Sequence, residues 1–297
     1  MSSKGQPFIS LIPPRRQEKK PPSAFFGQAA LHNVLRDQFS LATWLCMGAV
    51  LQGILYMTIG RLSLLPACSL LLFKTLTTAG TSLCLLRNPY MDRVILNKIS
   101  TQIPDDHGQQ GTKPANAELV VFLIGIQVNH PLGILAPGVK ATGDYFESMT
   151  RDLDDKADEY GFMGMTSWLN GSDRESKNML LNVCYFRSVE GLHEFAHDAL
   201  HRKGWDFWNK IYKTHPHITL YHEMYHVPRG NYESIFINSR PSLSGTNFTS
   251  YTDPKTGEKM WASPVVDASK GLLRTSAGRM SRSDATENDK YGPGSYA

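Results

Sequence analysis

Residues 118–128 read ELVVFLIGIQV, an apolar run rich in β-branched side chains. Such a run is typical of a strand that is buried on both faces of a sheet. Alternation along the strand places Val120, Phe122 and Ile124 on one face, and Val121 and Leu123 on the other. Both faces of the sheet that contains this strand therefore need a cover.

The segments that follow alternate between helix and strand patterns. Residues 142–160 and 189–212 carry apolar side chains at helical spacing, and Ser188 is placed to cap the second helix. The further strand patterns cover residues 162–169, 179–187, 218–226 and 232–238. The order β-α-β-β-α-β, followed by a terminal strand, is that of the ferredoxin-like split β-α-β fold. We therefore predict an α+β domain over residues 118–240.

A sheet of this kind carries its helices on one face and normally leaves the other face open to water. Because Val121 and Leu123 make the second face apolar, we expect a second copy of the sheet to cover it. The prediction is a homodimeric α+β barrel.

The regions on either side of this domain differ from it in composition. Residues 87–117 contain the turn-rich stretch PDDHGQQGTKPANA and are predicted to form a linker. Residues 241–297 are rich in Ser, Thr, Gly, Asp and Lys, which predicts disorder. Residues 1–40 are polar, basic and proline-rich, and we expect them to be flexible.

Residues 41–60, LATWLCMGAVLQGILYMTIG, carry no charge. Twenty residues at about 1.5 Å per residue span roughly 30 Å, the hydrocarbon thickness of a bilayer. Residues 62–86 form a second apolar stretch, interrupted by Pro66 and Lys74. Since a lysine in mid-span is costly, this stretch either spans the membrane or lies at its surface. We predict one or two transmembrane helices over residues 41–86, and a helical hairpin if both segments span.

The charges before these segments predict their orientation. Residues 1–40 hold six basic side chains and two acidic ones, which places the N-terminus in the cytoplasm by the positive-inside rule. A hairpin returns the soluble domain to the cytosol, as in a multi-pass protein of the endoplasmic reticulum membrane. A single span places it in the lumen, where the sequons at Asn170 and Asn247 become glycosylation candidates.

Composition excludes several classes of function. The chain has 297 residues, with 31 basic and 27 acidic side chains, an imbalance too weak to indicate a nucleic-acid partner. Four cysteines without a CxxC pattern do not make a disulfide scaffold. Because GxGxxG, Walker and GxSxG motifs are absent, a Rossmann-type cofactor site is not indicated.

Residues 193–208, HEFAHDALHRKGWDFW, concentrate histidines on one predicted helix. His193, His197 and His201 are spaced four residues apart and form one stripe, which Trp205 extends. The letters HEFAH formally match HExxH, but a zinc protease also needs a third ligand and a pocket. The stripe otherwise lines a cavity, or it forms a solvated helix edge beside aromatic side chains.

A second histidine group lies in the strand pattern 218–226. Alternation places His222 and His226 on one face, and Tyr225 on the other. His222 either faces a cavity between sheet and helices or is an ordinary strand histidine. Trp168 and Tyr185 add aromatic surface from the neighbouring strands.

Two runs, YFRSVEGLHEFAHDALHRKGWDFW at 185–208 and ITLYHEMYHVPRGNYESIFIN at 218–238, carry a family resemblance. They resemble the antibiotic biosynthesis monooxygenase superfamily, over about residues 118–240. With the two apolar segments ahead of this region, the chain is similar to fungal membrane-anchored members of secondary-metabolite pathways, including that of fumagillin.

This resemblance implies a dimeric α+β barrel and a monooxygenase that oxidises a hydrophobic terpenoid or polyketide-like intermediate. It implies O₂ as co-substrate with no metal or flavin, although some relatives of the barrel bind haem. Two alternatives stay open. One is a haem- or metal-dependent lyase or dehydratase on the same barrel, and the other is a non-catalytic, membrane-anchored binding module.

On the oxygenase interpretation, the histidines and aromatic residues take separate roles. We expect His197 to act as a base near its natural pKa, with His201 and His222 orienting the substrate. Trp168, Trp205, Tyr185 and Tyr225 are expected to bind the hydrophobic substrate. No residue is predicted as a metal ligand.

Overall fold

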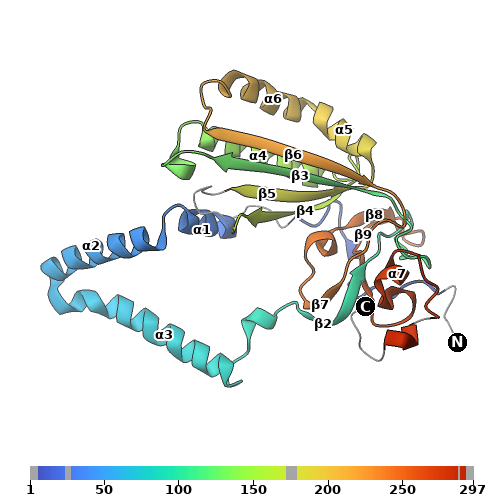
Figure 1. The fold of residues 1–297 in the computed structure, drawn as a ribbon, viewed down its shortest axis with the longest axis horizontal. Coiled ribbons are helices and arrows are strands. Elements are labelled where there is room, and N and C mark those ends of the chain that lie inside the picture. The colour runs from blue at the N-terminus through green and yellow to red at the C-terminus, as the bar shows by residue number, and fades with distance from the viewer. Residues whose placement is uncertain (1–5, 24–27, 172–178, 287, 292–297) are drawn as a thin grey trace.

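The computed structural model describes residues 6–23, 28–171, 179–286 and 288–291. At its centre lies an antiparallel sheet of four strands in the order β4-β5-β3-β6 (Figure 1). The strands are β3 (Leu119–Val128), β4 (Phe162–Leu169), β5 (Leu180–Phe186) and β6 (Ile218–Val227). The strands predicted between residues 118 and 226 are therefore confirmed.

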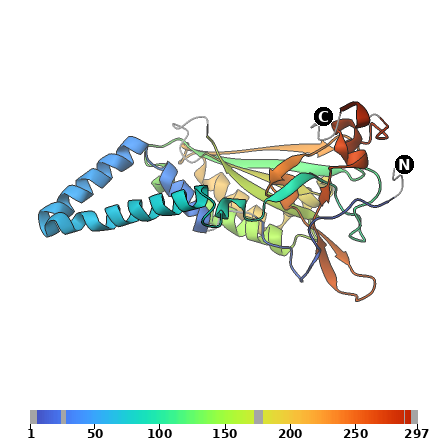
Figure 2. The ribbon, with the colours of Figure 1, turned by 90° about the horizontal axis from the view of Figure 1, so that it is seen from below.

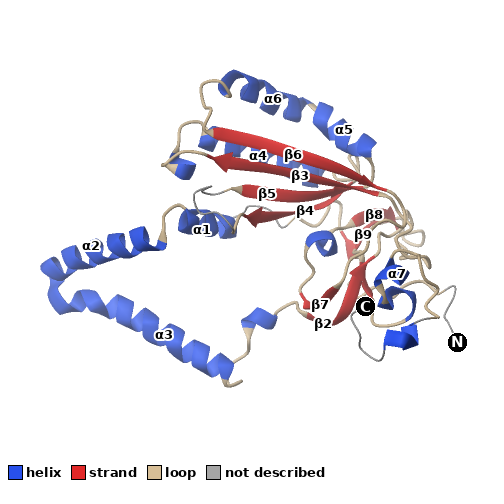
Figure 3. Cartoon of the chain, viewed as in Figure 1, coloured by secondary structure: helices blue, strands red, loops and turns tan. Residues whose placement is uncertain are grey.

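Helices lie against one face of this sheet (Figure 3). They are α4 (Val139–Asp155), α5 (Val189–His197) and α6 (Ala199–Ile211). The chain order β-α-β-β-α-β agrees with the prediction, and the fold is α+β. The long helix expected over 189–212 is broken at Asp198, whose backbone is extended at ψ 151°. Ser188 caps α5 as predicted, since its hydroxyl accepts a hydrogen bond from the Gly191 amide at 3.1 Å.

The core between the sheet and the helices contains an aromatic side chain from the C-terminal part of the chain. Val120, Phe162 and Phe186 of the sheet pack there against α4 and α5. Trp261 of β9 (Lys259–Ala262) lies among them with 2% of its surface exposed. Its indole Nε1 donates a hydrogen bond to the Gln17 carbonyl at 3.0 Å. Both terminal parts of the chain therefore belong to this core.

The predicted disorder of residues 241–297 is wrong for the residues that the structure describes. They form β8 (Thr249–Thr252), β9, β10 (Val265–Asp267) and α7 (Ser276–Arg279). The segment has few apolar residues, but several of them are buried, among them Val265, Val266 and Leu273. The average composition of the segment predicted disorder because it does not reveal these few core positions.

The predicted flexibility of residues 1–40 is also wrong wherever they are described. The strand β1 (Arg15–Arg16) pairs with β9, and β8 pairs with the other edge of β9. The Lys20 ammonium is buried against Phe162 and lies 2.8 Å from the Asp154 carboxylate of α4. A buried charge of this kind is stable because it is paired. Helix α1 (Gln28–Asp37) follows this segment.

The region predicted as a linker contains a central strand of a further sheet. The strand β2 (Ile95–Thr101) pairs with β10 along one edge and with β7 (Phe236–Ser239) along the other. Ile99 in its middle is fully buried. The terminal strand expected over 232–238 thus exists in part as β7, and it belongs to this sheet rather than to the four-stranded one.

The face of the main sheet opposite the helices is covered in part by the chain itself. Leu119, Met163 and Tyr185 on this face pack against Ile103, Val227, Tyr232 and Leu243. The homodimer was predicted from the apolar character of this face alone. Since an intramolecular cover exists at this end of the sheet, the homodimer stays a prediction that rests on the remainder of the face.

An apolar helical hairpin projects from this body (Figures 1 and 2). Helix α2 (Leu41–Ile59) meets α3 (Leu65–Ser82) at a tight turn, Gly60–Leu64. The positive φ of Gly60, 61°, ends α2, and Pro66 stands in the first turn of α3. Within the stretch Leu41–Ser82, an 18-residue window has a mean hydropathy of 1.5 and is almost wholly exposed. By length and composition it is one candidate for crossing a membrane.

If Trp261 is part of the main core, W261A should lower the free energy of unfolding by about 3–5 kcal/mol, because it leaves a large cavity. The matched control is W205A on α6, since Trp205 is 55% exposed. That change should cost less than about 0.5 kcal/mol. Denaturant unfolding of the full chain in detergent measures both. Equal losses for the two variants would mean that β9 does not stabilise the core.

Candidate functional site

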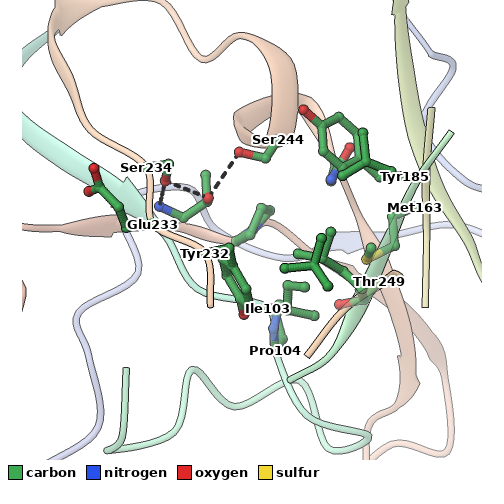
Figure 4. A pocket seen from close by; sticks show the side chains of 15 residues that line it. Ile103, Pro104, Met163, Tyr185, Tyr232, Glu233, Ser234, Ser244 and Thr249 are labelled. Atoms are coloured by element: carbon green, nitrogen blue, oxygen red, sulfur yellow. Dashed lines mark hydrogen bonds between the residues drawn. The ribbon is translucent and has the colours of Figure 1, made fainter. Parts of the chain in front are cut away.

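A cavity of about 190 Å³ lies between the helix-free face of the main sheet and the C-terminal part of the chain (Figure 4). It is lined by Thr101, Ile103, Pro104, Leu119, Val121, Met163, Tyr185, Val227, Tyr232, Glu233, Ser234, Ser244, Asn247, Thr249 and Pro264. The sheet provides its floor, and segments distant in the sequence provide its walls. A concave apolar site with a few convergent polar groups is the usual form of a ligand pocket.

The floor of the cavity follows directly from strand alternation. Leu119 and Val121 of β3 point to the helix-free face, and Tyr185 of β5 is the cross-strand partner of Val121. Met163 of β4 lies beside them and is almost fully buried. These side chains make an apolar surface with one phenol on it.

A chain of hydroxyl groups forms one wall (Figure 4). The Thr101 Oγ1 lies 2.7 Å from the Ser234 Oγ and 3.0 Å from the Ser244 Oγ. The Thr101 amide also donates to the Ser234 Oγ at 2.8 Å. These contacts join β2 to the two loops on either side of β7, so they hold the wall in place.

Asn247 and Thr249 add buried polar atoms to the lining of the cavity. The two residues are 3% and 4% exposed, and both line the cavity. Within the described residues, neither the Asn247 Oδ1 nor the Thr249 Oγ1 has a hydrogen-bond partner. A buried polar atom left in this state costs about 1–3 kcal/mol. A ligand with a hydrogen-bond donor would remove that cost.

The position of Asn247 depends on a glycine in β4. A Cβ at Gly164 would lie 2.7 Å from the Asn247 Oδ1. The absence of a side chain at Gly164 therefore lets the C-terminal segment approach the sheet. The burial of Asn247 also excludes a glycan on this sequon in the folded chain. Part of the sequon at Asn170 lies outside the described residues.

Two tyrosines in the cavity are held in their neutral form. Burial raises the pKa of Tyr185 to about 12, although a hydrogen bond with the Ser244 backbone works in the opposite direction. Burial likewise raises the pKa of Tyr232 to about 12. At physiological pH both phenols keep their protons and are able to donate hydrogen bonds.

An ion pair joins Glu233, one of the lining residues, to the C-terminal helix α7. The Arg279 guanidinium is buried and donates from Nε to the Glu233 carboxylate at 2.5 Å. Its Nη1 donates to the carbonyls of Leu273 and Arg274, both at 3.1 Å. The Glu233 charge is therefore satisfied by α7.

The predicted histidines lie away from this cavity. His222 of β6 is on the helix-covered side of the sheet, where its ring centroid is 5.6 Å from that of Phe122. His201 of α6 is half-buried, 5.1 Å from the Phe195 ring. Burial lowers the pKa of His201, and the nearby His197 and His222 lower it further. Both histidines therefore lie on the helix-covered side of the sheet.

His197 does not continue the expected stripe. Its ring is exposed, and its Nδ1 lies 2.7 Å from the His193 carbonyl of its own helix. The break at Asp198 separates α5 from α6 and ends the regular spacing on which the stripe depended. The proposed base thus makes its hydrogen bond within α5 and not toward the cavity.

The HExxH interpretation finds no support in the geometry. His193 and His197 have their ring centroids 6.4 Å apart on the exposed part of α5. Among the described residues, no group of three or more His, Cys, Asp or Glu side chains is placed to hold a metal ion. The third ligand that such a protease needs is therefore not provided there.

The aromatic candidates are dispersed. Of the four, Tyr185 lines the cavity. Trp168 and Tyr225 are exposed elsewhere on the helix-free face of the sheet, where Trp168 donates to the Thr166 hydroxyl and Tyr225 to the Glu223 carboxylate. Trp205 is exposed on α6. The structure thus brings Tyr185 together with residues that the sequence analysis missed, above all Tyr232, Asn247 and Thr249.

Comparison with known proteins identifies the family. The family described as Monooxygenase af470-like matches residues 119–243. Monooxygenase af470 of Aspergillus fumigatus is 35% identical over 252 residues, which cover 84% of this chain and 90% of the relative. The chain belongs to the monooxygenase af470-like family. It is a monooxygenase, and the resemblance stated from the sequence is confirmed.

Solved structures show more distant likenesses. SnoaB of Streptomyces nogalater, a cofactor-independent oxygenase, is 14% identical with a TM-score of 0.27, over 38% of this chain and 96% of its own. A putative antibiotic biosynthesis monooxygenase of Caulobacter crescentus is 10% identical with a TM-score of 0.28, over 38% and 93% of the two chains.

The close approach of Asn247 to Gly164 predicts that a side chain at position 164 lowers the stability of the protein. G164A places a methyl group against the Asn247 Oδ1, so we expect the free energy of unfolding to fall by about 1–3 kcal/mol. The matched control is G171A, because no described atom other than those of its chain neighbours lies within 4 Å of the added Cβ. Denaturant unfolding compares the two variants. If they are equally stable, Asn247 does not pack on β4.

Proposed function

We propose that the protein is a membrane-anchored monooxygenase that oxidises a hydrophobic terpenoid or polyketide-like intermediate in the cavity. The observation that carries this proposal is that, among the described residues, Asn247 Oδ1 and Thr249 Oγ1 have no hydrogen-bond partner, in a cavity whose floor is apolar. Such a site favours an apolar ligand that bears a hydroxyl group. A cavity of about 190 Å³ accepts the reacting part of such a molecule and O₂.

The hairpin supports the membrane part of the proposal. The side chains of α2 and α3 are mostly apolar and exposed, which is costly in water and favourable in lipid. Its two ends lie on the same side, and residues 1–40 are basic. We therefore place the body in the cytosol at the endoplasmic reticulum membrane, where lipophilic intermediates accumulate.

The proposed reaction uses O₂ as co-substrate and no metal, flavin or haem. One oxygen atom enters the substrate, the other leaves as water, and oxidation of a CH₂ group to a carbonyl supplies the electrons. No external reductant is needed for this balance. We also propose that the protein forms a homodimer. The interface would be the exposed part of the helix-free face, around Trp168 and Tyr225.

A turnover assay distinguishes a reaction in the cavity from a reaction at the histidines. With full-length protein in detergent, a panel of lipophilic terpenoids and ¹⁸O₂, a product with one ¹⁸O atom is expected. N247L should lower kcat/KM about tenfold, because it removes a hydrogen bond of about 1.4 kcal/mol. H197A should leave turnover unchanged, since His197 bonds within its own helix.

Loss of turnover in H201A and H222A, with N247L fully active, would place the reaction on the helix-covered side of the sheet instead. Thermal unfolding of each variant controls for loss of fold. An absorption spectrum with a Soret band, or one metal ion per chain, would contradict the cofactor-free reaction.

A further inference from the structure

We propose that the body contacts the membrane at a second place, a patch that we call the foot patch. It comprises Leu132 and Leu135 in the β3–α4 connection, and Tyr212 and Lys213 at the end of α6. The occupant that we assign to it is the lipid headgroup region. This inference rests on the membrane anchoring proposed above and adds a contact made by the catalytic body itself.

The foot patch is fixed to the root of the hairpin. Gln38, which is buried, lies three residues before α2 begins at Leu41. Its Nε2 donates to the Leu132 carbonyl at 2.6 Å, and its Oε1 accepts from the Ile134 amide at 3.1 Å. The β3–α4 connection therefore cannot move independently of the point where the hairpin leaves the body.

The fit around Gln38 also requires a glycine. Gly133 has a positive φ of 53°, and a Cβ there would lie 2.3 Å from the Gln38 Oε1. The connection thus adopts a backbone that lets the amide of Gln38 reach two main-chain groups. The hydrogen bonds of Gln38 therefore hold the leucines of the foot patch in a defined position.

The leucine side chains of the foot patch are exposed on the surface of the body. Leu132 is 51% exposed and Leu135 is 68% exposed. Leu41, the first residue of the hairpin, is exposed to the same extent as Leu135. Two large apolar side chains beside a membrane anchor are favourable when they enter the acyl boundary.

The rim of the foot patch has the composition of a membrane interface. The Lys213 ammonium lies 5.7 Å from the centroid of the Tyr212 ring, and Tyr212 is exposed. The rings of His130 and His217, 5.0 Å apart, bring the α6–β6 connection beside the β3–α4 connection. Aromatic and basic side chains prefer the headgroup region. Neither residues 129–140 nor residues 211–220 include an acidic side chain.

Both the β3–α4 and the α6–β6 connections lie on the side of the body that would face the membrane. In Figures 1 and 2 the end of the main sheet that holds them is the end from which the hairpin projects. A hairpin alone would leave the body free to swivel, whereas a second contact restricts its orientation.

A fluorescent label at single cysteines tests the foot patch. Replacing Cys46, Cys68 and Cys84 by alanine leaves Cys184, which is buried. Into this full-length background we would introduce L132C or L135C, and I9C as the matched control at an exposed apolar residue beside β10. A variant that keeps Cys68 reports on the hairpin. Each is labelled with an environment-sensitive dye and reconstituted into phosphatidylcholine–phosphatidylserine vesicles with brominated acyl chains.

We expect bromine to lower the fluorescence about twofold at L132C and L135C, because interfacial side chains enter by roughly 5–10 Å. It should also quench the label at Cys68 and leave the label at I9C unchanged. Quenching at Cys68 with both leucine positions unquenched would overturn the foot patch and leave the anchoring intact. No quenching at Cys68 would overturn the anchoring and the foot patch together.

Discussion

The main sheet is apolar on both faces, and the rest of the structure depends on how each face is covered. The helices α4, α5 and α6 cover one face, as in other split β-α-β folds. Part of the other face is covered by segments from the two halves of the chain, through Ile103, Tyr232 and Leu243. The cover does not fill the space above Val121 and Tyr185, and the cavity forms there.

This cover ties the termini to the core. Gln17 accepts a hydrogen bond from Trp261, and Lys20 pairs with Asp154 of α4. The N-terminal strand β1 and the C-terminal strand β9 therefore hold each other in place. As a result, the folded body extends well beyond residues 118–240 on both sides. Strand β3 runs the length of the main sheet. Leu119 at its start lines the cavity, and Val128 at its other end lies on the side from which the hairpin projects.

The candidate site was predicted in small part from the sequence. Alternation correctly placed His222 and Tyr225 on opposite faces, but it does not tell which face contains a void. Helical spacing predicted a continuous stripe through His197, and the break at Asp198 interrupts it. Asn247 and Thr249 lie in a segment whose composition resembles a disordered tail, so no local signal marked them. The two short apolar runs within 259–266, KMWASPVV, were the nearest available indication.

The sequence by itself determined the order of strands and helices in the domain, the apolar hairpin and the family. Each of these follows from patterns within short stretches of chain, namely periodicity, hydropathy and motif spacing. The tertiary structure decided that both terminal regions fold against the core wherever they are described, and it decided where the cavity lies. These depend on contacts between residues far apart in the chain, such as Trp261 with Gln17 and Gly164 with Asn247. A residue such as Asn247 is buried because a distant strand leaves room for it, which no local pattern encodes.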